Sequence, residues 1–380
     1  MLVLQSIYQE TFTMPYPQFD RSKLIVKSLA QRPNKLVIEK DHVNPDQSPA
    51  PLAEPAMKLM TETVARIRSA RQAGKPVVMA FGAHTIKNGL APVLIKLMEK
   101  GWLTHLATNG AGIIHDWEFA YLGQSSEDVK SNVARGEFGI WQETGFFLNL
   151  AIIVGAYEGL GYGESVGKLM ECEGLTLPSE AALMEEIRSL SATADRVAAA
   201  ADLLGTIRTF KLKPGFMAVP HPFKAYSAQA AAARLRIPFT GHPMIGHDII
   251  YNHPMNHGAA IGRTALRDFM SFTHSISQIE GGVYLSVGSA VMSPMIFEKA
   301  LSMSQNLALQ AGPPIRRHFI VVVDLAESTW DWQTQGEPPK DNPAYYLRYC
   351  KTFSRMGGEM RYLSADNRDF LLTLSQMLET

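Results

Sequence analysis

Short apolar segments typical of buried strands alternate along this chain with segments of helical periodicity, from about residue 56 to the C-terminus. The predicted strands cover residues 77–81, 104–108, 237–240, 282–287, 319–323 and 359–363. Helical spacing begins at Met57, and further helices are predicted at 90–98, 224–236, 262–279, 294–310, 343–356 and 367–377. Because the strands are apolar on both faces, they predict an α/β fold with a doubly wound, mostly parallel sheet covered by helices.

Two regions interrupt the alternation. Residues 1–55 are rich in proline and charge, so we predict a helical or irregular N-terminal extension packed on a core, not a domain. Residues 56–380 are predicted to form one domain, with a largely helical insertion at about 138–212, in which Ser179 caps a helix that continues past Ala200. The glycines of 155–167 favour a helical turn or close packing over a phosphate loop, because no Gly-Lys-Ser/Thr follows them.

The composition limits the classes of partner. Among 380 residues, 36 Lys and Arg balance 36 Asp and Glu, so the chain has no overall field that would attract nucleic acid or an anionic membrane. We expect a small-molecule substrate instead. Cys172 and Cys350 lie far apart without zinc-type spacing, which indicates a reduced, cytoplasmic setting. Neither a leader-like N-terminus nor a run of about 18 apolar residues is present in the sequence, so we expect an unexported, soluble protein.

The predicted strands end in small and polar residues. In a parallel sheet these ends emerge at one edge and would converge on a single crevice. They are Gly82-Ala83-His84-Thr85, Thr108-Asn109-Gly110 continued by Ala111-Gly112, Gly241-His242, Gly288-Ser289 and Asp324-Leu325-Ala326. Backbone amides for phosphates and an acid for a ribose are what a dinucleotide needs, although any one of these turns also serves as a plain strand-to-helix connection.

In the order of its motifs, the chain resembles deoxyhypusine synthase and the related homospermidine synthases, from about residue 76 to 378. Residues 81–89 are similar to that family's early nucleotide-contacting turn, and 108–116 to its Thr-Thr-Ala-Gly-Gly-Val-Glu-Glu-Asp segment. Residues 237–248 fall where the family has Pro-Ala-Leu-Thr-Asp-Gly-Ser, 323–327 match its Asn-Thr-Ala-Gln turn, and 359–366 resemble its last strand and Asp-Ala turn.

The resemblance implies a deoxyhypusine synthase-like, Rossmann-like NAD-binding fold over residues 56–380 and a homodimer or homotetramer with cofactor sites between subunits. Predicted NAD contacts, from the strand ends and the resemblance together, are Gly82, Ala83, His84, Thr85, Thr108, Asn109, Gly110, Ala111, Gly112, His242, Gly288, Ser289, Asp324, Leu325, Ala326, Ser364 and Asp366. An acid on the ribose, Asp324 or Asp366, favours NAD over NADP because it would repel a 2′-phosphate.

The departures from the family bear on the reaction. Where the family has its imine-forming lysine, this chain has Ser293, and a hydroxyl cannot form a Schiff base. Lys299 is the nearest lysine, and helical spacing carries it a turn away from the strand end. The family's Glu-Glu pair is replaced by Ile114-His115. We therefore predict that the chain does not synthesise deoxyhypusine.

Histidines beside carboxylates are the predicted catalytic groups. Four of the 11 histidines lie between residues 242 and 257, and the pairs His115-Asp116 and His247-Asp248 could move protons near neutral pH. With NAD as oxidant, these four residues predict hydride or proton transfer on a small molecule. Three alternatives stay open: histidines that only bond backbone in a crowded loop, a non-catalytic nucleotide-binding or sensing module, and a metal-dependent enzyme with ligands at His242, His247 and Asp248.

Overall fold

A six-stranded, wholly parallel sheet lies at the centre of the computed structural model, which describes residues 16–189 and 191–380. Its strand order is β10-β9-β8-β2-β3-β7. The strands are β2 (Val77–Phe81), β3 (His105–Thr108), β7 (Phe239–Gly241), β8 (Val283–Val287), β9 (Phe319–Asp324) and β10 (Glu359–Ser364). All six were predicted from the sequence, and the predicted α/β class is confirmed.

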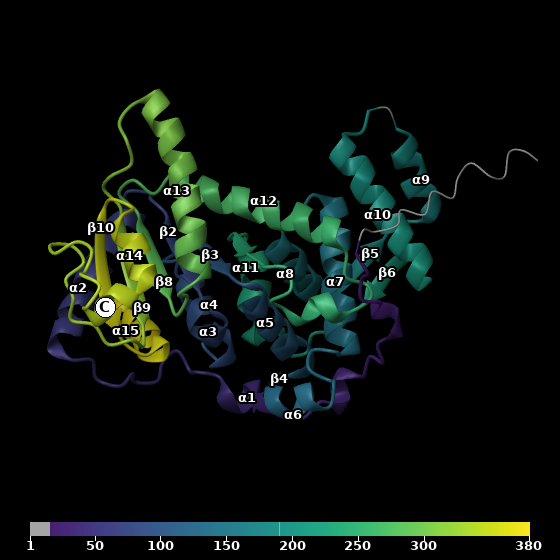
Figure 1. Cartoon of the computed structure of the whole chain (residues 1–380), viewed down its shortest axis with the longest axis horizontal. Coiled ribbons are helices and arrows are strands. Elements are labelled where there is room, and N and C mark those ends of the chain that lie inside the picture. Colours follow the sequence, from purple (N-terminus) through teal and green to yellow (C-terminus); the bar gives the residue numbers. More distant parts are fainter. Residues whose placement is uncertain (1–15, 190) are drawn as a thin grey trace, which may run out of the picture.

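The sheet is buried on both faces because alternate side chains point to opposite sides. Val77, Met79 and Phe81 of β2 pack into one apolar cluster, and Val78 and Ala80 pack into the other. The first face is covered by α2 (Glu54–Gln72), α4 (Ala91–Glu99) and α15 (Asn367–Glu379), and the second by α12 (Gly258–Ser277), α13 (Met292–Ala311) and α14 (Arg348–Ser354). Figure 1 shows β8, β9 and β10 on its left side, with α12 extending from there across the middle of the picture.

The order of the strands reverses between β2 and β8. The chain runs outward through β2, β3 and β7 in one direction, and then outward through β8, β9 and β10 in the other. At this reversal the two turns lie in contact, since a Cβ on Gly82 would lie 2.0 Å from the carbonyl oxygen of Gly288. Gly288 itself has a φ of +58°, which a side chain rarely adopts.

Helices fill most of the region between β3 and β7. They are α5 (Gly110–Leu122), α6 (Val129–Ala134), α7 (Gln142–Glu158), α8 (Tyr162–Cys172), α9 (Glu180–Arg188), α10 (Ala194–Phe210) and α11 (Ala228–Leu235), with α3 (Ala83–Lys87) after β2. Figure 1 shows α9 and α10 at the end of the molecule remote from β9 and β10. The predicted close packing of glycines is confirmed at Gly155, where a Cβ would lie 1.8 Å from Ser165 Oγ.

Two details of this region correct the predictions. Ser179 does cap a helix, but that helix ends at Arg188. Thr193 caps a second one by accepting from the Arg196 amide, and it is this second helix that continues past Ala200. The short antiparallel pair β5 (Gly174–Leu177) and β6 (Gly215–Ala218) was not predicted.

The N-terminal extension contributes regular structure from residue 16 onward. After two short 3-10 turns, η1 (Arg21–Lys23) and η2 (Leu29–Gln31), β1 (Asn34–Val37) pairs antiparallel with β4 (Gln124–Glu127) and leads into α1 (Ile38–Asp41). The predicted boundaries at residues 55 and 138–212 stay predictions. No single helix in the described ranges is long and apolar enough to cross a membrane; α7 and α8 pass only as a pair bent by 109°.

Candidate functional site

A cavity of about 200 Å³ lies where α5, the end of β4 and the segment after β7 meet. His115, His247 and Asp248 line it together with Lys87 and Glu127. Three of the four predicted catalytic residues therefore line one space beside the carboxyl edge of the sheet, although His115 lies more than 130 positions before the other two.

The N-terminus of α5 forms one wall of the cavity. Asn109 caps the helix by accepting from the Gly112 amide at 2.9 Å, which explains why the strand ends there. A Cβ on Gly110 would lie 2.0 Å from Oδ2 of Asp248, so the glycine lets this carboxyl group approach the helix N-terminus. The turn that the sequence assigned to a phosphate is thus packed against a carboxyl group of the chain itself.

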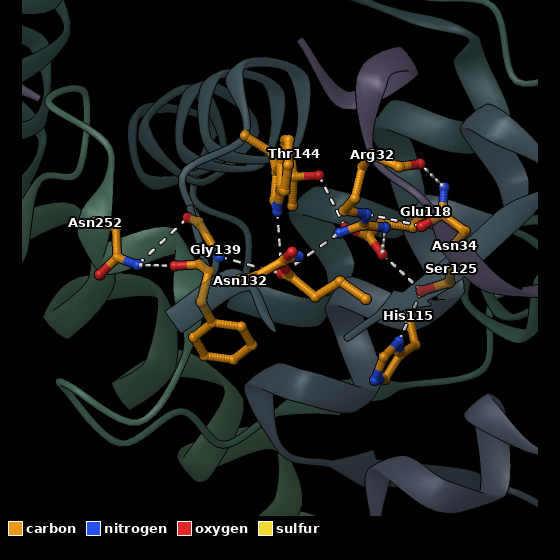
Figure 2. Close-up of polar contacts among 12 residues, drawn as sticks. Arg32, Asn34, His115, Glu118, Ser125, Asn132, Gly139, Thr144 and Asn252 are labelled. Atoms are coloured by element: carbon orange, nitrogen blue, oxygen red, sulfur yellow. Dashed lines mark hydrogen bonds and ion pairs between the residues drawn. The ribbon is translucent and has the colours of Figure 1, made fainter. Parts of the chain in front are cut away.

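A chain of hydrogen bonds fixes the tautomer of His115. Glu118 accepts two bonds from Arg32 (2.8 and 2.6 Å), one from Thr144 (3.0 Å) and one from the Ser125 hydroxyl (2.6 Å). Since the Ser125 hydroxyl donates its hydrogen bond to Glu118, its oxygen must accept from Nδ1–H of His115, 2.7 Å away (Figure 2). The Nε2 atom of His115 therefore carries a lone pair.

The floor of the cavity is a buried ionic network. Burial by itself would raise the pKa of Glu118. The charge and hydrogen bonds of the Arg32 guanidinium have the larger combined effect and hold that pKa below its ordinary value. Arg32 is only 4% exposed and also lies 3.8 Å from Glu127. Glu127 in turn accepts from Asn132 (2.5 Å), the Gly139 amide (3.1 Å) and the Trp141 indole (3.0 Å). Every member of this network is hydrogen-bonded, which is the condition for burying charge.

Burial moves the pKa values of His115 and Asp248, which both line the cavity, in opposite directions. It lowers the pKa of His115 to about 4 and raises the pKa of Asp248 to about 7. Oδ2 of Asp248 and the hydroxyl of neighbouring Tyr251 have no hydrogen-bond partner among the described residues. Between about pH 4 and 7 the cavity thus holds a neutral imidazole and a protonated acid, a combination suited to general acid–base chemistry.

Asp116 does not belong to this site, which corrects one predicted catalytic residue. It follows His115 in α5 and therefore points to another side of the helix. Its buried carboxylate accepts from Ser227 Oγ (2.6 Å) and from the amides of Ala228 (3.1 Å) and Gln229 (3.0 Å) at the start of α11. Asp116 joins two helices, and the predicted His115-Asp116 pair does not form.

The four clustered histidines have separate positions. His242 is buried with Nε2 on Thr240, His247 is exposed at the cavity, His253 is buried against Gln142, and His257 caps α12 by accepting from the Ala260 amide. Within the described ranges no three His, Cys, Asp or Glu side chains are arranged to hold a metal ion. The metal-dependent alternative therefore has no support in the described residues.

The remaining predicted cofactor residues lie along the carboxyl edge, and several have local roles. Ser289 accepts from the Ser293 amide (3.2 Å), Asp324 from the Ala326 amide (3.1 Å), and Asp366 caps α15 through the Arg368 amide (2.8 Å). The turns after β2, β8, β9 and β10 still share one edge. Ser293, at the family's lysine position, is fully buried against the Tyr284 hydroxyl at 2.9 Å.

Sequence reasoning missed Arg32, Glu118, Ser125 and Glu127. Glu118 lies three residues after His115, on the same side of α5, so helical spacing alone could have paired them. Arg32 belongs to the N-terminal extension, and nothing in its local sequence indicates its buried partner.

Matches to known proteins were found among solved structures only. No protein-family model matches the sequence, and no curated protein matches it. Among solved structures, unliganded AgrE gives a TM-score of 0.43 at 16% identity over 87% of this chain and 34% of its own. A conserved putative LOR/SDH protein from Methanococcus maripaludis S2 gives 0.40 at 12% identity (88% and 70% covered). A putative deoxyhypusine synthase from Entamoeba histolytica gives 0.34 at 12% identity (81% and 84% covered).

These likenesses are distant ones in fold. The chain spans about a third of the length of AgrE. At such scores the similarity concerns only the general arrangement of strands and helices, and no statement about function rests on it.

Proposed function

We propose that this chain is an NAD-dependent enzyme that transfers a hydride and a proton on a small molecule, and that it does not synthesise deoxyhypusine. The observation that carries the proposal is the pair formed by His115 and Asp248, whose pKa values burial shifts in opposite directions within one cavity. Groups matched in this way are typical of acid–base catalysis.

The proposed place for NAD is the reversal of strand order between β2 and β8, because ligands of open α/β sheets bind outside the carboxyl ends at such a point. Gly82 and Gly288 are the proposed diphosphate contacts, and the space left by their missing side chains is filled by the Gly288 carbonyl oxygen and by Asn367. At the α5 turn, the space beside Gly110 is filled in the same way by the Asp248 carboxyl group. Bound NAD would supply the hydride acceptor, and Asp324 at the end of β9 is the proposed ribose acid.

The chain's own residues would handle the proton. Nε2 of His115 takes a proton from an oxygen or nitrogen of the substrate, and the resulting imidazolium is stabilised through Ser125 by the Glu118 carboxylate. In the reverse direction, Asp248, with its pKa near 7, could give a proton to the anion that forms when a hydride is added to the substrate. A cavity of about 200 Å³ limits this part of the substrate to a small molecule.

Two measurements test the proposal. Calorimetric titration of the purified chain with NAD and with NADP should show binding of NAD that His115→Gln leaves unchanged and Asp324→Ala weakens. A screen of small alcohols, amines and hydroxy acids for NADH formation should then show activity that His115→Gln lowers by about 10²–10⁴-fold. If neither NAD nor NADP binds, the proposal is refuted.

A non-catalytic nucleotide-binding module is the second candidate. A fully buried Ser293 in place of a nucleophilic lysine is what such a protein would show. NAD binding without turnover of any screened substrate, and without an effect of His115→Gln, would favour it. The homodimer or homotetramer implied by the resemblance is likewise a proposal, and light scattering tests it.

A further inference from the structure

Three polar side chains lie in a row on the sheet face that α12 covers. His105 begins β3, and Thr240 of β7 pairs in register with Ala107, two residues further along β3. His242 follows Thr240 by two positions. Because side chains alternate between faces, residues 105, 240 and 242 all project to the same side. The row therefore leads from the amino end of β3 to the carboxyl edge just past β7.

Hydrogen bonds connect the row without a gap. Ser275 Oγ on α12 lies 2.8 Å from His105 Nδ1, His105 Nε2 lies 3.0 Å from Thr240 Oγ1, and Thr240 Oγ1 lies 2.9 Å from His242 Nε2. The Phe272 ring packs against both imidazoles: its centroid lies 5.6 Å from that of His105 and 5.3 Å from that of His242. His105 and Thr240 are buried, whereas Ser275 is half-buried and His242 is 8% exposed. The Ser275 end of the row is thus open to solvent, the middle is closed, and the His242 end keeps a small exposed area.

The Thr240 hydroxyl has only one proton to donate, and when it donates that proton to one of the two rings the row has two arrangements. In the first, Ser275 donates to His105 Nδ1, His105 Nε2–H donates to Thr240, Thr240 donates to His242 Nε2, and His242 carries its proton on Nδ1. In the second, every bond is reversed and His242 Nδ1 is bare. In both, the two histidines hold opposite tautomers.

We propose that Ser275, His105, Thr240 and His242 form a proton relay that delivers protons to, or removes them from, the carboxyl edge of the sheet. When a base at the edge takes the Nδ1 proton of His242, His242 Nε2 takes the Thr240 proton and Thr240 takes the Nε2 proton of His105. His105 Nδ1 then takes the Ser275 proton, and Ser275 regains one from solvent water at α12. Each bond broken is matched by one formed, and the row is left in the second arrangement.

The surroundings favour transfer between neutral groups. Burial lowers the pKa of both His105 and His242 to about 3, so neither ring is an imidazolium near neutral pH. Among the described residues, Nδ1 of His242 has no hydrogen-bond partner. The backbone amide of His242 donates to the carbonyl of Thr108 at 2.8 Å, which places the His242 backbone at the end of β3, next to the turn that opens α5. The relay supplies a proton path that the proposed acid–base pair does not include, and it exists whether or not NAD binds.

Nitrogen NMR of the full chain, labelled with ¹⁵N in histidine only, tests the relay without any turnover. His105→Gln and His242→Gln assign the two sets of signals. We expect both rings to be neutral from pH 5 to 8, and the Nε2–H fraction of His105 to equal the Nδ1–H fraction of His242 at every temperature. Thr240→Val should abolish this equality, and Thr240→Ser, which keeps the hydroxyl, should preserve it.

Thr264→Val is the matched control, because Thr264 is a buried threonine whose hydroxyl bonds only within α12. It should leave the tautomers of both histidines unchanged. The relay is refuted if both rings carry their proton on Nε2, since Thr240 would then accept from both and turn its own proton to the Leu106 carbonyl, 3.5 Å away. It is also refuted if either ring is charged in this pH range, or if Thr240→Ser behaves as Thr240→Val does.

Discussion

At the scale of single residues, Glu118 holds the candidate site together. Its two oxygens accept four hydrogen bonds from three side chains, and one of those donors sets the tautomer of His115. The arrangement depends on a full negative charge, because both Arg32 nitrogens and both hydroxyls are donors. A neutral replacement would leave the guanidinium of Arg32 buried without a counter-charge other than Glu127, 3.8 Å away.

We therefore predict that Glu118→Gln lowers the free energy of unfolding by about 3–5 kcal/mol, as breaking a buried ion pair does. Urea titration of the two proteins measures it. Glu180→Gln is the control, because the Glu180–Arg208 pair is about half exposed and should contribute less than about 1 kcal/mol. Equal effects of the two substitutions would contradict the importance of the network.

Asp268 gives a second prediction at this scale. It is 3% exposed, accepts from the amides of Gly163 (2.8 Å) and Gly241 (2.6 Å), and has its pKa raised to about 8, mainly by burial. The unfolded carboxyl group loses its proton near pH 4, whereas the folded one keeps it until about pH 8. In this window the folded state binds more protons, so the contribution of Asp268 to stability falls as pH rises.

Asp268→Asn removes that titration. Melting temperatures at pH 5 and pH 8 should show the variant gaining stability relative to the unsubstituted chain as pH rises. If the difference between the two proteins is the same at both pH values, the pKa of Asp268 is not raised in the folded chain.

At the scale of elements, the N-terminus of α5 shows how one glycine brings two segments together. Gly110 is the first residue of the helix, and its missing Cβ is what admits the Asp248 carboxyl group. The segment between β7 and α12 is thereby held against the helix that carries His115. Loss of this fit would move Asp248 out of the cavity rather than unfold α5.

Gly110→Ala should therefore destabilise the chain by about 1–3 kcal/mol, the usual effect of overpacking. Gly205→Ala is the matched control, because Gly205 lies inside α10 with open space around its Cβ position, and alanine should stabilise that helix by up to about 1 kcal/mol. Thermal unfolding of both variants measures the contrast. Adding Asp248→Ala to Gly110→Ala should recover part of the loss, and the contact is unimportant if it does not.

At the scale of the whole molecule, buried histidines are spread through the fold. Burial is the main cause that lowers the pKa of His105 and His242 to about 3 and the pKa of His115, His221 and His253 to about 4. In the unfolded chain these rings take up protons below about pH 6.5. Each one therefore reduces stability as pH falls from about 6.5 toward its folded pKa, by up to about 1.4 kcal/mol per pH unit.

We expect His221→Phe to become more stable relative to the unsubstituted chain as pH falls from 6.5 to 4.5, because the aromatic contacts with Trp117 and Tyr121 can be kept without a titrating ring. Urea unfolding at several pH values measures the slope. The exposed His274 provides the control, and His274→Gln should follow the slope of the unsubstituted chain. Parallel slopes for all three proteins would contradict this account of acid sensitivity.

The order of strands and helices could be predicted from the sequence, because each signal is local: an apolar run of about five residues, a helical spacing, a capping side chain. The strands β1 and β4 escaped prediction because they are short and partly polar. His115, His247 and Asp248 could be named as acid–base candidates from their residue types alone. Asp116 was wrongly paired with His115, because adjacent residues on a helix point to different sides. Its actual partners, at the start of α11, depend on how the helices pack.

What the sequence determined by itself is therefore the parallel α/β framework and the edge at which its strands end. Only the tertiary structure decided that Arg32, His115, Glu118 and Asp248 meet around one cavity. The physical reason is that secondary structure follows from neighbours a few residues apart, whereas the charge, tautomer and pKa of a buried group depend on partners brought from distant parts of the chain.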